Sequence, residues 1–258
     1  MKTHKDLYLQ ERQSDIVRLV SENERVSVSE LSHRYGVSEV TIRSDLQVLA
    51  NQGLLVRTHG GAVPNNQRVT ILPLTARLQL QEQEKRRIGR EAAKGINSGD
   101  AIFLDTSSTT LAIAKNLKKH RYLTIITNSL AVAQEMLDSP GSEVVMIGGR
   151  LRRDTASLVG IEGIEMLRDY HIQKGFFGIH GITFEAGLTD VSVDEAEVKR
   201  PLVKMCRQVI AVFDSTKWGK IGLSTFAKLH EIDQIISDDA PVEIAEQIRS
   251  LGIDLKLV

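Results

Sequence analysis

The stretch that decides the fold of the N-terminal part spans residues 27–63 and reads SVSELSHRYGVSEVTIRSDLQVLANQGLLVRTHGGAV. Ser27 and Glu30 have the S-x-x-E spacing of a capping box, in which each side chain accepts a hydrogen bond from a free backbone N–H group at the start of a helix. Gly36 can form a sharp turn after that helix, and Ser38 can cap the next one. The pattern therefore predicts two short helices joined by a turn.

The second predicted helix runs from Glu39 to Gln52 and ends at Gly53, because a glycine commonly follows the last residue of a helix. Apolar residues at helical spacing should face a core together with two residues that precede this helix. The expected core residues are Leu31, Val37, Val40, Leu46 and Leu49. The opposite face carries Glu39, Thr41, Arg43, Ser44 and Gln47. Short hydroxyl groups and an arginine near a helix N-terminus suit contacts with DNA bases and phosphates.

Residues 54–63 have the pattern of a two-stranded ribbon with a glycine turn. Arg57 and His59 on this ribbon could reach the DNA backbone or the minor groove as a wing. The alternative interpretation is a small helical domain with a solvated polar face. Because the turn, the caps and the ribbon agree with one another, the sequence favours a winged helix-turn-helix that binds DNA.

The net charge of this N-terminal part does not by itself indicate a nucleic-acid partner. Residues 1–64 hold eight basic residues (Lys2, Lys5, Arg12, Arg18, Arg25, Arg34, Arg43, Arg57) and eight acidic ones (Asp6, Glu11, Asp15, Glu22, Glu24, Glu30, Glu39, Asp45). Nucleic-acid-binding proteins usually show a basic footprint, so a single neutral head should bind weakly. An oligomer that presents several heads would supply the missing affinity, and the symmetry of DNA sites favours at least a dimer.

The composition of the whole chain indicates a globular protein of the cytoplasm. Its 258 residues are 41% hydrophobic and 26% charged, which is ordinary for a soluble protein. The single cysteine, Cys206, excludes an internal disulfide framework. No apolar run approaches the roughly 18 residues that a membrane helix needs, and Met1–Gln10 is too polar for a signal peptide.

We expect the winged head to occupy residues 1–63, a linker 64–77, and a second domain 78–258. The linker is proposed because prolines stand at both ends of a loop-like stretch, Pro64–Pro73. A charged helix is expected at about Leu78–Ile96, and it could transmit a signal from the second domain to the head.

The second domain alternates short apolar runs with helical patterns. The expected strands are Ala101–Asp105, Leu123–Thr127, Glu143–Ile147, Gly175–His180, Val209–Asp214, Gln234–Ser237 and Leu255–Val258. The helical patterns include Leu111–Leu117, Ala131–Leu137, Glu195–Cys206 and Val242–Leu251. Nearly continuous apolar runs are typical of strands buried on both faces, so we predict an α/β fold with an open, mainly parallel sheet. A ligand is then expected at the carboxyl ends of the strands.

Polar loops follow several of these strands. The stretches are Asp105–Thr110, Thr127–Ser129, Gly148–Arg150 and Asp214–Lys217. Ordinary helix caps look the same when taken one at a time. Together, backbone N–H groups, hydroxyls and the ammonium of Lys217 on one sheet edge favour a pocket for a phosphorylated metabolite.

The motif Thr41–Leu46, with Gly36–Ser38 before it and Arg57–Ala62 after it, resembles the DeoR family of bacterial regulators of sugar metabolism. Members of that family commonly carry Arg or Lys where this chain has Ser44, so one expected cationic contact is missing. The polar loops of the second domain resemble the sensor domains of the same family. This resemblance implies a sensor similar in fold to ribose-5-phosphate isomerase and the coenzyme A transferases.

The resemblance also implies a transcriptional regulator, and we expect a repressor of a carbohydrate-utilisation operon. Its partners would be operator double-stranded DNA, a sugar-phosphate effector and further copies of itself, as a dimer or tetramer. The residues expected to bind DNA are Ser38, Thr41, Arg43, Ser44, Arg57 and His59. Those expected to bind the effector are Asp105, Ser107, Ser108, Thr109, Thr110, Asn128, Gly149 and Lys217. In this assignment the loop Ser107–Thr110 holds phosphate, Lys217 adds charge and Asp105 binds sugar hydroxyls.

A sugar-phosphate isomerase fused to a DNA-binding head is the alternative function. The isomerase carries paired acids after its central strand, whereas the matching stretch here, Gly178–Ile182, has none. Asp194, Glu195 and His180 could act as a base, but acids in the first turn of a capped helix and a loop histidine explain them equally well. The sequence has no G-x-G-x-x-G or Walker motif and no metal-ligand spacing of its histidines, so we expect no catalytic residues, cofactor or metal.

Overall fold

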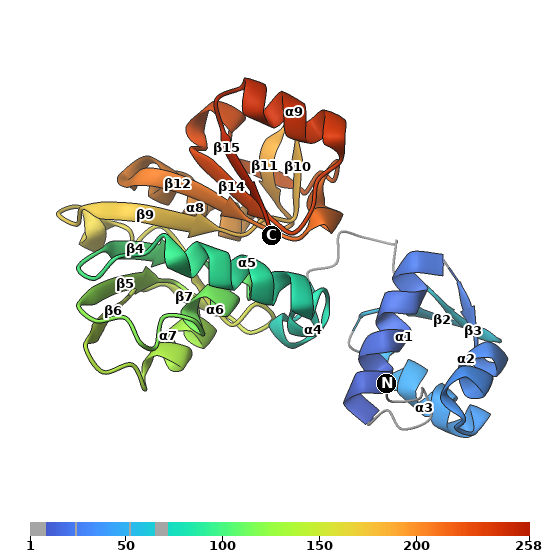
Figure 1. Ribbon diagram of the computed structural model, residues 1–258. Helices are drawn as coiled ribbons and strands as arrows, with labels where there is room; N and C mark the ends of the chain where they lie inside the picture. Colours follow the sequence, from blue (N-terminus) through green and yellow to red (C-terminus); the bar gives the residue numbers. More distant parts are fainter. Residues whose placement is uncertain (1–8, 24, 52, 65–71) are drawn as a thin grey trace. The chain divides into compact units, whose positions relative to one another are not determined.

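The computed structural model describes residues 9–23, 25–51, 53–64 and 72–258. The chain forms two compact units, Met1–Leu80 and Gln81–Val258, which are drawn in Figure 1.

The described residues of the N-terminal unit form four helices and a small antiparallel sheet. The helices are α1 (Leu9–Asn23), α2 (Val28–Tyr35), α3 (Glu39–Asn51) and, at the end of the unit, α4 (Leu74–Gln79). The sheet has the order β1 (Val26–Ser27), β3 (Gly61–Val63), β2 (Val56–Thr58). Ile16, Leu31 and Leu46 are among the fully buried side chains that form its core. This is the predicted arrangement, with the added strand β1 and helices α1 and α4.

The predicted capping box at the start of α2 is confirmed. The backbone N–H of Glu30 donates to Ser27 Oγ at 3.1 Å, and the backbone N–H of Ser27 donates to Glu30 Oε2 at 3.0 Å. Gly36 ends the helix in the left-handed region with φ of 64°, a conformation that glycine adopts without steric cost. Ser38 caps α3, because its hydroxyl accepts the backbone N–H of Thr41.

One expected core position in α3 is wrong. Val40 is 73% exposed, while Ile42, which was not assigned to the core, is fully buried. The reason is helical geometry, since Ile42 lies one turn before Leu46 and two turns before Leu49, and Val40 falls on the other side of that apolar stripe.

The region between the two units differs from the expected loop-like linker. Residues 65–71 of the expected linker 64–77 lie outside the described residues. Helix α4 (Leu74–Gln79) occupies its last part, and the chain divides into its two units only after Leu80. The expected charged helix is α5 (Glu82–Lys94), which begins four residues later than predicted.

The larger unit is built on a seven-stranded sheet in which every described pairing is parallel. Its strands are β4 (Ala101–Leu104), β5 (Leu123–Thr127), β6 (Ser142–Met146), β9 (Ile172–Phe177), β12 (Cys206–Val212), β14 (Gln234–Ser237) and β15 (Asp254–Leu257). They follow the order β15-β14-β12-β9-β4-β5-β6. All seven runs expected to be strands therefore pair in one sheet, with ends that shift by up to three residues.

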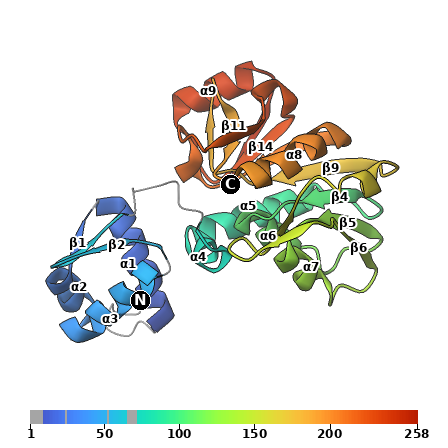
Figure 2. The same cartoon turned by 180° about the vertical axis from the view of Figure 1, so that it is seen from behind.

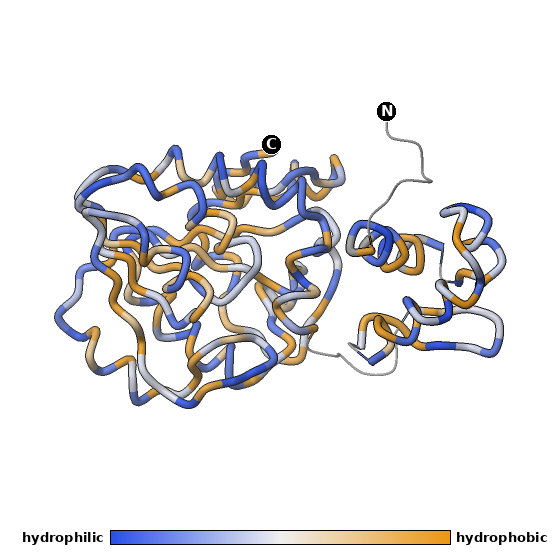
Figure 3. Tube along the Cα trace, turned by 90° about the horizontal axis from the view of Figure 1, so that it is seen from below, coloured by the Kyte–Doolittle hydropathy of each residue, from blue (hydrophilic) through white to orange (hydrophobic). Residues whose placement is uncertain are grey.

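Helices cover both faces of this sheet. They are α5, α6 (Ser108–Ala114), α7 (Leu130–Met136), α8 (Val193–Met205) and α9 (Val242–Ser250). Helices α5, α6 and α7 pack side by side, and α8 comes to the front in the reversed view of Figure 2. The apolar segments of the strands lie in the interior of the unit, where Figure 3 shows them in orange.

Two groups of short strands were not predicted. The strands β7 (Arg150–Arg152) and β8 (Ser157–Val159) form a hairpin, and β10 (Gly181–Thr183), β11 (Gly187–Asp190) and β13 (Ser224–Ala227) form a second antiparallel sheet. They have at most four residues each, which is too short for a hydrophobic period to be visible in the sequence.

Candidate functional site

The order of the large sheet reverses between β4 and β9. From β4 the chain proceeds through β5 to β6 in one direction, and from β9 it proceeds through β12 to β15 in the other. In open α/β sheets, ligands bind in the crevice outside the carboxyl ends of the strands at such a switch point. Asp105 follows β4 and Gly178 follows β9, so these two residues lie at that switch point.

Asp105 is fully buried and its carboxylate is saturated by four donors. Oδ1 accepts the backbone N–H of Ser107 at 2.9 Å and the hydroxyl of Thr110 at 3.0 Å. Oδ2 accepts the backbone N–H of Gly178 at 2.8 Å and pairs with Lys199 Nζ at 2.9 Å. A carboxylate has about four acceptor sites, so Asp105 as folded holds the loop after β4 in place and has none left for a sugar hydroxyl.

Ser107 begins α6 in the way a serine cap should. Its hydroxyl accepts the backbone N–H of Thr110 at 3.0 Å. Ser107 is half-buried, whereas Ser108, Thr109 and Thr110 are buried. The expected hydroxyl loop therefore exists, and its Ser107 lies against Gly178: a Cβ added to that glycine would meet Ser107 Oγ at 2.3 Å.

Lys199 is a buried cation that the sequence analysis did not assign to the site. It is 4% exposed, pairs with Asp105 and with Asp190 Oδ2 at 2.8 Å, and donates to the carbonyl of Gly178 at 2.8 Å. Its ammonium also lies 4.9 Å from the centre of the Phe226 ring. Burial by itself would lower the pKa of Lys199, but the charges of Asp105 and Asp190 outweigh it and raise the pKa above its ordinary value.

Glu195 completes this buried cluster. Its carboxylate accepts the hydroxyls of Thr106 at 3.1 Å and Ser157 at 2.6 Å, and Ser192 caps its helix. Glu195 and Lys199 are four residues apart, on the face of α8 that also buries Leu202. Charged residues at the spacing of a buried helix face are the sequence signal that could have identified this cluster.

Asn128, at the end of β5, has an acceptor without a donor. It is 1% exposed, and its Nδ2 donates to the carbonyl of Leu158 at 3.0 Å. Its Oδ1 has no hydrogen-bond partner among the described residues. Because a buried polar atom left unpaired is costly, this oxygen is available to a donor from outside the protein, either a ligand or a water molecule.

The hairpin of β7 and β8 lies next to Asn128. The backbone N–H of Leu158 donates to the Asn128 carbonyl at 2.8 Å, and that of Leu130 donates to Ala156 at 3.0 Å. Gly149, at the base of the hairpin, has φ of 144°, and a Cβ there would lie 2.5 Å from the Val159 carbonyl oxygen. Only glycine fits this position.

Lys217 lies beyond the carboxyl end of β12, in the short helix Ser215–Lys217 that Asp214 caps. The neighbouring loop reaches β10, because the N–H of Gly219 donates to the Ile182 carbonyl at 3.0 Å. Burial, followed by the charge of Lys217, lowers the pKa values of His180 and Lys220. Lys217 and Lys220 therefore bring two cationic groups close to His180, next to the end of β9, and the carboxylates of Asp190 and Asp214 are close enough to act on the same groups.

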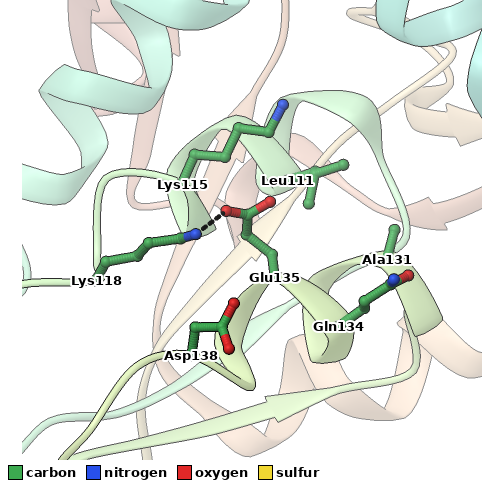
Figure 4. A pocket seen from close by; sticks show the side chains of 7 residues that line it. All are labelled: Leu111, Lys115, Lys118, Ala131, Gln134, Glu135 and Asp138. Carbon is green, nitrogen blue, oxygen red and sulfur yellow. Dashed lines mark ion pairs between the residues drawn. The ribbon is translucent and has the colours of Figure 1, made fainter.

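The structure also has an open hollow away from this edge, of about 360 Å³, between α6 and α7. Its lining residues, labelled in Figure 4, are Leu111, Lys115, Lys118, Ala131, Gln134, Glu135 and Asp138. Lys118 and Glu135 form an ion pair across it at 2.8 Å. None of the predicted effector residues lines this hollow.

In the N-terminal unit, the six residues expected to contact DNA are exposed or half-buried on α3 and the ribbon. Arg43 pairs with Glu39 at 2.7 Å, and Arg57 donates a hydrogen bond to Gln47. Asp45 is different, because it is buried and accepts hydrogen bonds from Arg12 at 2.7 Å and Gln13 at 3.0 Å. Its carboxylate therefore orients neighbouring groups within the head.

Among the described residues, no group of His, Cys, Asp or Glu side chains is arranged to hold a metal ion. None of the helices formed by these residues combines the length and apolar character needed to cross a membrane.

Comparison with protein families gives two matches. The model of the DeoR C terminal sensor domain matches residues 80–239, and that of the DeoR-like helix-turn-helix domain matches residues 12–68.

Curated relatives match along nearly their whole length. The HTH-type transcriptional regulator GolR of Listeria innocua serovar 6a is 36% identical over 89% of this chain and 90% of its own. The putative aga operon transcriptional repressor of Escherichia coli O157:H7 is 34% identical over 96% of this chain and 93% of its own. The glycerol-3-phosphate regulon repressor of Escherichia coli K12 is 31% identical over 96% of this chain and 98% of its own.

Solved structures match more distantly. Ribose 5-phosphate isomerase A from Methanocaldococcus jannaschii has a TM-score of 0.40 and 15% identity, over 53% of this chain and 54% of that one. The full-length sorbitol operon regulator SorC from Klebsiella pneumoniae has a TM-score of 0.35 and 9% identity, over 96% of each chain.

Proposed function

Because the chain belongs to the DeoR family of transcriptional regulators, we propose that it represses a carbohydrate-utilisation operon and is controlled by a phosphorylated sugar. The N-terminal unit binds operator DNA, and the crevice at the β4–β9 switch point binds the effector. The protein acts in the cytoplasm, where its DNA is.

The observation that carries the effector site is the unpaired Oδ1 of Asn128. The amide is held in one orientation by its hydrogen bond to Leu158, so the atom that faces the free position is an acceptor. A sugar hydroxyl donates to such an atom, whereas a fully ionised phosphate cannot. This pairing favours a polyol or sugar attached to the phosphate over a simple anion.

The phosphate end of the effector is assigned to the cationic side of the crevice. Lys217 supplies the charge, and Lys220 lies close to it as a second cation. Ser107, Ser108 and Thr109 offer hydroxyls and backbone N–H groups. The remaining predicted contacts have different roles: Gly149 lets the backbone approach the effector closely, and Asp105 and Thr110 hold the loop.

On the DNA side, Ser38, Thr41, Arg43 and Ser44 contact the operator from α3, and Arg57 and His59 contact it from the ribbon. Arg43 must leave its pair with Glu39 to do so. Both side chains are about half exposed, so that exchange costs little. Binding by two or four heads of a dimer or tetramer compensates for the neutral charge of each.

The isomerase alternative is not favoured. Both oxygens of Glu195 are engaged by hydroxyls, and Asp194 lies 3.4 Å from Arg150. A general base needs an oxygen within reach of the substrate proton; Glu195 has none free, and Asp194 is a partly exposed acid whose Oδ2 is paired with arginine. We therefore propose binding without turnover, so that effector and operator influence each other through a coupling free energy.

The test is a binding measurement on the full-length protein with a panel of sugar phosphates and with inorganic phosphate, by calorimetry. One sugar phosphate should bind more tightly than inorganic phosphate. Lys217→Ala should weaken that binding by about 1.5–3 kcal/mol, the usual value of a hydrogen bond to a charged group. Asn128→Ala should weaken sugar-phosphate binding and leave inorganic phosphate unchanged.

Lys118→Ala is the matched control, since it removes the same charge from the hollow between α6 and α7. It should leave the affinity unchanged. If Lys118→Ala abolished effector binding and Lys217→Ala did not, the effector site would be that hollow and not the crevice.

A further inference from the structure

Val40 is an exposed apolar residue in the first turn of α3. It is the most exposed valine of this helix, at 73%, and it stands among polar neighbours. The buried side of the helix is formed by Ile42, Asp45, Leu46 and Leu49. Val40 is therefore not a core residue displaced by an irregular helix, because a complete apolar stripe lies on the other side.

Val40 begins the stripe that faces away from the core. Ser44, Gln47 and Asn51 follow it at intervals of four, three and four residues, so all four share one line along the helix surface. In a helix-turn-helix, the N-terminal residues of the second helix reach the base edges in the major groove. Val40 lies at the N-terminal end of this stripe, which is the end expected to enter the major groove deepest.

Several polar residues of α3 and its cap already have partners within the head. Ser38 and Thr41 share a hydrogen bond of 2.9 Å between their hydroxyls. Gln47 donates to Asn51 at 2.8 Å and accepts from Arg57. These side chains must exchange partners to read a base, whereas the isopropyl group of Val40 needs only an apolar surface.

The apolar group that the major groove presents is the 5-methyl of thymine. Resting on the DNA-binding function proposed above, we infer that Val40 determines operator specificity by packing on the 5-methyl group of a thymine. Serine, threonine and glutamine contacts then supply position and hydrogen bonding, and Val40 supplies discrimination between thymine and the other bases at one position in each half-site.

The test begins with an operator selected from random duplexes by the full-length protein. Each thymine of that operator is then replaced, one at a time, by deoxyuridine, which lacks only the 5-methyl group. One replacement in each half-site should weaken binding of the unaltered protein about fourfold, the factor expected for one buried methyl group. Val40→Ala should weaken binding to the thymine operator and lose the distinction between thymine and deoxyuridine at that position alone.

Val48→Ala is the matched control, because Val48 is a second exposed valine of α3 that lies outside the stripe. It should retain the full deoxyuridine effect. Alanine is a better helix former than valine, so neither variant should unfold the head. If every deoxyuridine effect survived in Val40→Ala, the inference would be refuted while DNA binding stood. If the protein selected no sequence at all, the DNA-binding proposal would fail, and this inference with it.

Discussion

Replacing Lys199 by methionine tests the buried ion pairs beside the proposed effector site. Lys199 is 4% exposed and is the ion-pair partner of both Asp105 and Asp190, at 2.9 and 2.8 Å. Methionine keeps most of the length and apolar character of the side chain and removes the charge. Two carboxylates, one fully buried, then lose their shared counter-ion.

The expected cost follows from that geometry. Removing one member of a buried ion pair destabilises a protein by about 3–5 kcal/mol, because the remaining charge is left buried and uncompensated. For a unit of this size, that is a fall of roughly 10 °C in the midpoint of thermal unfolding. The pKa of Lys199 is raised by its partners, so this contribution is present at neutral pH and is lost only when the pH exceeds the ordinary range of lysine.

Trp218 provides the assay, since it is the one tryptophan of the chain and lies in the C-terminal unit. Its ring packs edge-on against the ring of Phe213, with 4.8 Å between the two ring centroids, and its Nε1 donates to the Asp239 carbonyl at 2.9 Å. Unfolding of this unit should therefore change its fluorescence, which can be followed in urea for the unaltered protein and for Lys199→Met.

Lys94→Met is the control. Lys94 pairs with Glu91 at 2.6 Å, but its side chain is largely exposed, and such pairs contribute less than about 1 kcal/mol. If Lys199→Met cost no more than Lys94→Met, the buried cluster would not hold the crevice together by charge.

Three further predictions concern the caps, the hairpin and the crevice. Ser27→Ala should cost about 1 kcal/mol through loss of the capping box, seen as faster hydrogen exchange in α2. Gly149→Ala should cost about 1–3 kcal/mol and speed exchange in the β7–β8 hairpin, because its φ is 144° and its Cβ would meet Val159; Gly148→Ala, which meets nothing within 4 Å, should not. The stability of the protein should fall as the pH is lowered from 7 to 5, because burial and a nearby lysine charge hold the pKa of His180 below its ordinary value, and the unfolded chain binds that proton more readily. Urea titrations across this range should show a flatter dependence for His180→Gln.

The strands of the large sheet were predictable because they are buried on both faces. Runs such as Leu123–Thr127 and Gln234–Ser237 are almost wholly apolar or small, and their observed bounds equal the predicted ones. The capping box of α2 was equally visible, because it depends on two residues three positions apart. In each case the residues that make the element predictable lie within a few positions of one another in the sequence.

The features that were missed depend on contacts between distant residues. Lys199 reads as one charge in a charged helix, and its buried position follows only once Asp105, 94 positions earlier, is placed beside it. The β7–β8 hairpin contains Arg150 and Arg152, and its strands are stabilised by pairing and not by an apolar pattern. The exposure of Val40 was predicted wrongly for a different reason. A valine in a helix fits an apolar pattern, and Val40 is excluded from the core only once Ile42 is recognised as the start of the buried stripe.

The central claim is that one protein binds a specific operator and a sugar phosphate, and that each changes the affinity for the other. It is tested most directly by fluorescence anisotropy of the full-length protein on its selected operator at stated salt, with and without each compound of the sugar-phosphate panel. We expect one compound to change the operator affinity in the unaltered protein and to have little effect in Lys217→Ala. Arg43→Ala should weaken operator binding by about 1–3 kcal/mol with or without the compound. Operator binding that no compound alters, or turnover of a sugar phosphate by a protein without sequence preference, would contradict the account.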